Sequence, residues 1–191
     1  MDYISTRGQS PAVDSVQAVL SGLAPDGGLY MPRAIPAFDW QHCLTLSAQQ
    51  MSAAILSALL PDIPNMEALV KRAYTGKFET EDLTPTVPVG DFQVLELFRG
   101  PTSAFKDVAL SMLPQLLTAA KQEKGIAQEI RILTATSGDT GKAALVGFQD
   151  VPGVSICVFY PFGGVSQVQR AQMVTQEGEN VHVCAVEGNF D

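Results

Sequence analysis

The second half of the chain alternates apolar, strand-like runs with helix-like segments, and this alternation constrains the fold more than any other feature. The strand-like runs are FQVLELF (92–98), EIRILTAT (129–136), VSICVFYP (154–161) and NVHVCAVEG (180–188), and helical patterns at 103–125, 140–148 and 165–178 separate them. Strands separated by helices pair in parallel through right-handed crossovers. A run as apolar as ICVFY suits a sheet that is covered on both faces. The sequence therefore predicts a parallel, three-layer α/β unit.

The first 83 residues show a different, mostly helical pattern after a short extended start. YISTRG (3–8) favours a strand, and helical spacing predicts helices at 15–23, 46–60 and 66–78, the second with Ser47 as its N-cap. TPTVPVGD (84–91) holds two prolines and a glycine, which is typical of a boundary. We therefore predict a helical domain at 1–83, a linker at 84–91 and an α/β domain at 92–191.

The last residues, EGNFD, stop where a turn after a strand would open the next helix. We expect from this that the α/β domain is incomplete and that the chain is a piece of a longer protein. We also expect the uncovered strand edge to favour self-association.

The composition of the chain limits the kinds of binding partner and the cellular compartment that we expect. Twenty acidic against 12 basic residues give a net charge of −8, which argues against a nucleic-acid or anionic-membrane surface. The sequence has no apolar run near the length of a membrane span. Its three cysteines are far apart and form no CxxC pair, which favours free thiols in the cytoplasm. His42 and His182 stand alone, so we predict no metal site.

The segment ILTATSGDTGKAAL (132–145) is the sharper of two candidate sites. A strand leads into a turn with two glycines and then directly into a helix, so that backbone N–H groups of the first helical turn converge on one point. Such a turn is an anion site for a phosphate or a carboxylate, although it can also be a capped turn that binds nothing. A P-loop would need glycine at Thr136 and a hydroxyl residue at Ala143, so a nucleotide kinase is not supported.

The segment RGPTSAFKDV (99–108) is the second candidate. Gly100 and Pro101 break the preceding strand, Ser103 is a possible helix cap, and Lys106 lies among apolar residues at helical spacing. A lysine in partly apolar surroundings has a lowered pKa and forms Schiff bases. Considered alone, Lys106 fits a solvated lysine in a first helical turn better than it fits a nucleophile.

The two motifs together are far more specific than either alone. ELFRGPTSAFKD, followed about thirty residues later by TATSGDTGKAA, closely resembles threonine synthase, a pyridoxal-phosphate enzyme of the tryptophan-synthase-β-like fold. YISTRG, LAPDGGLYMP, PFGGVSQVQ and VEGNFD resemble further segments of that family, so that the resemblance covers essentially the whole chain. It implies an incomplete fold type II pyridoxal-phosphate enzyme.

The resemblance also implies roles for individual residues. Lys106 would form the Schiff base with pyridoxal 5'-phosphate and move protons at the substrate carbons. The substrate carboxylate would bind at Thr136, Ser137, Gly138 and Thr140. Related enzymes carry asparagine where this chain has Asp139, and we assign Asp139 to the cofactor side. The implied reaction converts O-phospho-L-homoserine and water to L-threonine and phosphate.

Departures from the family pattern leave alternatives open. Arg99 stands where many relatives have histidine and Ser103 where many have leucine, while Phe162 and Gly163 replace a common charged pair. Family members are more than twice as long, so we expect this chain alone to bind the cofactor weakly or not at all and to be inactive. The alternatives are a serine/threonine dehydratase, a cysteine-synthase-like enzyme, or a non-catalytic half-site that binds small anions.

Overall fold

The computed structural model describes residues 1–136 and 138–188, and these divide into two compact units. The first unit comprises Met1–Ala73 and Gln115–Ala127, and the second comprises Tyr74–Pro114 and the described residues from Gln128 onward. The predicted boundaries at 83 and 91 thus differ from the division that the contacts make, and the domain assignment stays a prediction.

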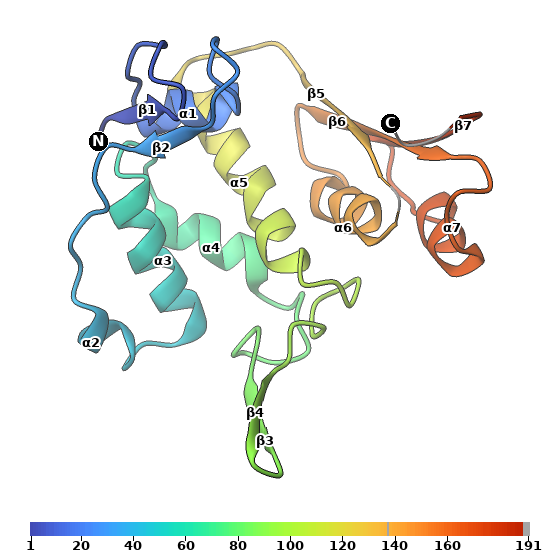
Figure 1. Cartoon of the computed structure of the whole chain (residues 1–191), viewed down its shortest axis with the longest axis horizontal. Coiled ribbons are helices and arrows are strands. Elements are labelled where there is room, and N and C mark those ends of the chain that lie inside the picture. Colours follow the sequence, from blue (N-terminus) through green and yellow to red (C-terminus); the bar gives the residue numbers. More distant parts are fainter. Residues whose placement is uncertain (137, 189–191) are drawn as a thin grey trace. The chain divides into compact units, whose positions relative to one another are not determined.

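The first unit combines helices with a two-stranded sheet (Figure 1). Strands β1 (Tyr3–Ser5) and β2 (Tyr30–Pro32) pair antiparallel, with Tyr3 opposite Pro32. The helices are α1 (Ser15–Ser21), α2 (Trp40–Cys43), α3 (Ala48–Leu59), α4 (Met66–Tyr74) and the second part of α5 (Asp107–Glu123). The predicted strand at YISTRG and the three predicted helices are therefore present.

The helix ends of this unit show why the sequence starts helices where it does. Ser47 accepts a hydrogen bond from the backbone N–H of Gln50, whose side chain accepts one from the backbone of Ser47, which is a complete capping box. The predicted N-cap is confirmed. Asp14 caps α1 in the simpler way, by accepting from the N–H of Gln17 at 2.6 Å.

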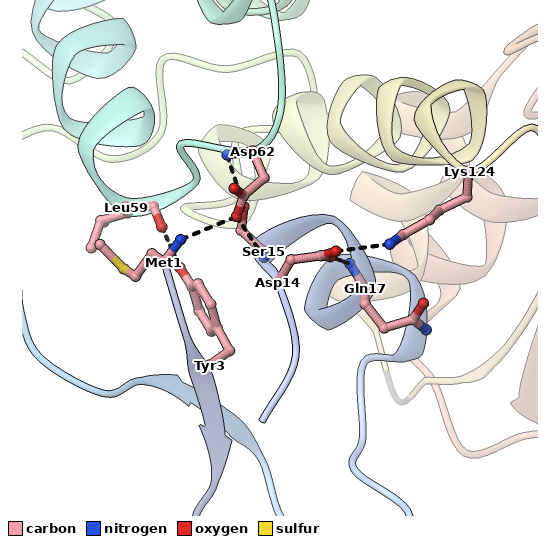
Figure 2. A network of polar contacts seen from close by, with 8 residues as sticks. All are labelled: Met1, Tyr3, Asp14, Ser15, Gln17, Leu59, Asp62 and Lys124. Carbon is pink, nitrogen blue, oxygen red and sulfur yellow. Dashed lines mark hydrogen bonds and ion pairs between the residues drawn. The ribbon is translucent and has the colours of Figure 1, made fainter. Parts of the chain in front are cut away.

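A polar network ties the start of the chain to the helices of the same unit (Figure 2). The Asp62 carboxylate accepts hydrogen bonds from the backbone N–H and the hydroxyl of Ser15, at 3.1 and 2.8 Å. The Tyr3 hydroxyl donates to the carbonyl of Leu59 at the end of α3. Asp14, besides capping α1, forms a 2.8 Å ion pair with Lys124, just beyond α5. These contacts join segments more than forty residues apart.

The second unit is built on a parallel sheet. Strands β5 (Ile130–Ala135), β6 (Val154–Pro161) and β7 (Val181–Val186) pair in that order, and helices α6 (Asp139–Phe148) and α7 (Gln167–Val174) connect them (Figure 1). Side chains of β6 alternate strictly between buried and partly exposed. The buried set, with side chains of both helices, forms the core: Leu145, Phe148, Ile156, Val158 and Met173. Burying each such side chain contributes about 1.5–3 kcal/mol.

The other face of this sheet carries exposed side chains. Leu133 on β5 is 72% exposed and Val186 on β7 is 46% exposed. Of the three layers that the sequence predicts, the described residues of this unit therefore supply the sheet and one helical layer. The mixed α/β class with a parallel sheet is confirmed.

One predicted strand lies elsewhere. Of the run FQVLELF, Phe92–Leu95 forms β4, which pairs antiparallel with β3 (Thr86–Val89) in a separate hairpin. The expected parallel pairing of this run is wrong, because the connection is a two-residue turn at Gly90–Asp91 and such a turn can join only antiparallel strands. Gly90 has a φ of +59°, which suits this turn. Strand β3 also occupies half of the predicted linker, four of its eight residues.

Candidate active site at Lys106 and the glycine-rich turn

Lys106 lies at the end of a loop that a buried carboxylate holds in place. Helix α5 begins at the next residue, Asp107, whose side chain is only 2% exposed. Its carboxylate accepts hydrogen bonds from the backbone N–H of Thr102 at 2.8 Å and from the Thr102 hydroxyl at 2.6 Å. A Cβ on Gly100 would lie 2.5 Å from this carboxylate, so only glycine allows the chain to pass there.

This loop differs from the one that the sequence predicts. Ser103 lies four residues before the first residue of α5 and has a φ of +58°, so it does not occupy the N-cap position. The helix begins later because Asp107 bonds backward to Thr102 and closes the loop on itself. Asp107 therefore stabilises both the loop, through its bonds to Thr102, and the start of α5, where its negative charge lies at the positive end of the helix dipole.

The amine of Lys106 meets a carboxylate of the glycine-rich turn. Lys106 Nζ lies 2.8 Å from Asp139 Oδ2 and 4.2 Å from the centre of the Phe105 ring. The Lys106 side chain is 26% exposed and that of Asp139 is 54% exposed. The hydrogen bond from Lys106 lowers the pKa of Asp139, its backbone N–H contacts add to this, and partial burial opposes it. The Asp139 side chain is therefore a charged carboxylate at neutral pH.

The turn itself is held from within. The buried hydroxyl of Thr136 accepts hydrogen bonds from the N–H groups of Gly138 and Gly141, both at 3.1 Å. A Cβ on Gly141 would lie 2.3 Å from the Thr136 methyl group, so the turn needs glycine there. The backbone N–H groups of Thr140 and Asp139 also help to lower the pKa of the Asp139 carboxyl. The Thr136 hydroxyl thus satisfies two backbone donors of the turn that leads into α6.

Gln169 of α7 closes against the same turn. A Cβ added to Gly138 would lie 2.3 Å from Gln169 Nε2. The carbonyl oxygen of this amide accepts from the N–H and the hydroxyl of Ser166, which fixes the side chain at the start of α7. In the sequence, Gln169 stands among other polar residues that indicate an ordinary solvated face. Only its capping-box spacing from Ser166 could have distinguished it.

The structure thus brings some of the predicted site residues together. Lys106 and Asp139 are in contact, and Thr140 is exposed beside them. Thr136 and Gly138 form the turn, but the Thr136 hydroxyl faces inward and braces it. Ser137, also predicted to bind the substrate, lies outside the described residues.

Two of the residues that depart from the family pattern, Arg99 and Phe162, are described by their contacts and their exposure. Arg99 bonds to Glu79 and to Glu96, each at 2.8 Å, and so ties the loop before β3 to the residues after β4. Phe162 is 67% exposed.

Among the described residues, no three histidine, cysteine, aspartate or glutamate side chains cluster in a way that would hold a metal ion. None of the described helices has the length and apolar character needed to cross a bilayer.

Comparisons with known proteins point in one direction. A family model described as "Threonine synthase N terminus" matches residues 2–74. The threonine synthase of Pseudomonas aeruginosa is 39% identical over all of this chain, which spans 42% of that relative. The threonine synthase of Saccharomyces cerevisiae is 39% identical over 99% of the chain, which spans 40% of it.

Solved structures agree. The crystal structure of a PLP-bound threonine synthase from Brucella melitensis matches with a TM-score of 0.90 and 39% identity, covering 100% of this chain and 42% of that one. The chain thus spans about two fifths of the length of the relatives it matches. The whole chain is thus similar to about two fifths of these threonine synthases, and its residues 2–74 match the model of their N terminus.

Proposed function

We propose that this chain supplies the N-terminal part of a pyridoxal-phosphate-dependent threonine synthase, with O-phospho-L-homoserine as substrate and L-threonine and phosphate as products. One observation supports the proposal above the others. The amine of Lys106 is held 2.8 Å from Asp139, at the mouth of a glycine-rich turn that opens helix α6. An amine beside a set of backbone donors is the combination that a cofactor aldehyde and a substrate carboxylate require.

The residues present fit pyridoxal 5'-phosphate. Lys106 is the one lysine of the two motifs that meets both an aromatic ring and a carboxylate, and Gly138 and Gly141 leave the room that the Gln169 and Thr136 side chains need against the turn. Lys106 would hold the cofactor, and Asp139 would lie next to the cofactor rather than next to the substrate carboxylate. When bound, the cofactor supplies an electron sink for the carbons of the substrate.

The chain's own groups account for several parts of this chemistry. Asp139 keeps the Lys106 amine oriented by accepting its hydrogen bond, because the lowered pKa of Asp139 leaves its carboxylate charged at neutral pH. Once Lys106 has lost its proton, Nζ takes up and returns protons at the substrate carbons. The N–H groups of Asp139 and Thr140, which help to lower the pKa of the Asp139 carboxyl, become donors for a substrate carboxylate when that side chain turns away. Thr136 stays in place as the brace of the turn.

The cytoplasmic location and self-association are parts of the same proposal. The three cysteines are free, as suits a reducing compartment. The edges of the three-stranded sheet, at β5 and β7, support pairing between copies. Light scattering over a range of concentrations tests this, and a constant monomer mass would refute self-association.

The decisive experiment combines this chain with the C-terminal three fifths of the Pseudomonas aeruginosa relative, joined in one polypeptide. The joined protein should release phosphate from O-phospho-L-homoserine, and Lys106→Ala should abolish the release. Lys121→Ala, on the later part of α5, is the matched control and should leave it intact. Phosphate release that survives Lys106→Ala would refute the assignment, and oxo-acid formation from serine or threonine without phosphate release would indicate a dehydratase.

The chain by itself should release no phosphate. Borohydride reduction in the presence of pyridoxal phosphate, followed by peptide mass spectrometry, measures cofactor attachment without requiring activity. Labelling should favour Lys106 over the other lysines and should fall when Lys106 is replaced by arginine. Equal labelling of all lysines would count against a preformed site.

A further inference from the structure

Two of the three cysteines lie side by side on the open face of the parallel sheet, far along the chain from each other. Cys157 is on β6 and Cys184 is on β7, and their sulfur atoms are 3.8 Å apart. We propose that this pair is a dithiol modification site, which a small-molecule disulfide oxidises to a disulfide bond between the two strands. This inference does not depend on the proposed function.

The register of the sheet explains the proximity. Cys157 lies opposite His182, and Cys184 lies two residues further along β7, opposite Phe159. Residues two apart on a strand point to the same face, so the two thiols share one face as diagonal neighbours. A disulfide bond is about 2.0 Å long, so the two sulfur atoms, now 3.8 Å apart, need to approach each other by about 1.8 Å for the bond to form.

The surroundings leave this pair accessible. Cys184 is exposed and Cys157 is half-buried, and Leu133, opposite Cys157 on β5, is 72% exposed. Cys43 differs in every respect, because it is buried at 6% exposure in the first unit. The chain therefore contains its own control thiol.

The exchange balances in two steps. The Cys184 thiolate attacks one sulfur of the small disulfide and expels one thiolate, which leaves a mixed disulfide on Cys184. The Cys157 thiolate then attacks the Cys184 sulfur and expels the second thiolate. Two protein thiols lose two protons and two electrons, and the small disulfide gains them as two thiols. Exposure makes Cys184 the first nucleophile, and burial, followed by the hydrogen bond with Cys184, raises the pKa of the Cys157 thiol.

The test uses the native chain and oxidised glutathione. After free thiols are alkylated in denaturant, the count should fall from three to one, and the protein should become lighter by two hydrogen atoms before alkylation. Trypsin should release residues 143–170 linked to residues 171–191. Dithiothreitol should restore all three thiols.

Two variants distinguish a disulfide between Cys157 and Cys184 from reactions of Cys43 or of a single thiol. Cys43→Ser should form the linked peptides as the native chain does, whereas Cys157→Ser should stop at a mixed disulfide on Cys184. Three outcomes would overturn the proposal: a native chain that retains three thiols, one that stops at the mixed disulfide, or one that links its peptides only between two copies.

Discussion

Replacing Asp107 by asparagine tests whether this carboxylate holds the loop that presents Lys106. Asp107 is 2% exposed and accepts two hydrogen bonds from Thr102, at 2.8 and 2.6 Å. Each hydrogen bond to a charged group contributes about 1.5–3 kcal/mol. Asparagine retains one acceptor but turns an N–H₂ group toward the other donor, so at least one bond is lost. The expected decrease in the free energy of unfolding is about 2–4 kcal/mol.

Two further variants provide a partial loss of these bonds and a control for the loss of unfolding free energy. Thr102→Val removes only the hydroxyl bond and should cost about 1.5–3 kcal/mol. Asp91→Asn, in the exposed turn between β3 and β4, is the matched control and should change stability by no more than about 0.5 kcal/mol. Urea unfolding followed by circular dichroism measures all three. Fluorescence of Trp40, the single tryptophan, monitors the first unit separately.

Stability alone does not show that Asp107 acts on Lys106. The second measurement is therefore borohydride trapping of pyridoxal phosphate under conditions in which Asp107→Asn is still folded. Labelling of Lys106 should fall toward that of the other lysines, and Thr102→Ser, which retains the hydroxyl, should keep it. The reasoning is wrong if Asp107→Asn unfolds at the same urea concentration as the native chain, or if it is less stable but labels Lys106 normally.

Three other changes test separate parts of the structure. Gly147→Ala would place a methyl group 2.1 Å from the Leu110 carbonyl oxygen, a backbone atom, so thermal melting should show a loss of about 1–3 kcal/mol or more. Ser47→Ala removes the cap of α3 and should cost about 1 kcal/mol, seen in the same melts and absent if the capping box does not form. The Ser5 hydroxyl bond and three further hydrogen bonds lower the pKa of Asp26 to about 2. Because this pKa is depressed, Asp26 stabilises the fold fully above about pH 3.8 and loses that effect as the pH falls toward 2. Acid titration of Asp26→Asn should therefore lack a part of the native chain's stability loss in that window, and identical acid profiles would refute it.

Much of the fold follows from local patterns. Strands β5, β6 and β7 were predictable because each is an apolar run of fitting length between turn residues. The β3–β4 hairpin was not, since its first strand contains Pro88 and its turn, Gly90–Asp91, reads locally as a linker. A two-stranded ribbon tolerates proline, because an edge position leaves a backbone N–H without a ladder partner.

For the candidate site, the sequence singles out residues but does not specify the contacts between them. The spacing of the two motifs identifies Lys106 and the turn, and the glycines follow from the space that the turn allows. The pairing of Lys106 with Asp139 joins residues 33 apart, and no local periodicity specifies it. The inward Thr136 hydroxyl is equally hidden, because a threonine at the end of a strand fits a substrate ligand and an internal brace alike.

The energetics of the Lys106–Asp139 pair decide what kind of site this is. Both side chains are partly exposed, at 26% and 54%, so water screens their attraction and the ion pair contributes about 0–1 kcal/mol. An ion pair this weak orients the Lys106 amine but does not hold it rigidly. A ligand that binds to the amine can therefore displace the Asp139 carboxylate at little cost in free energy. The buried Asp107 is the opposite case, because its bonds to Thr102 are shielded and costly to break. The chain therefore places its strong contacts in the loop that carries Lys106 and its weak contact at the amine, so that the backbone at Lys106 is held in place while Nζ can leave Asp139 and react.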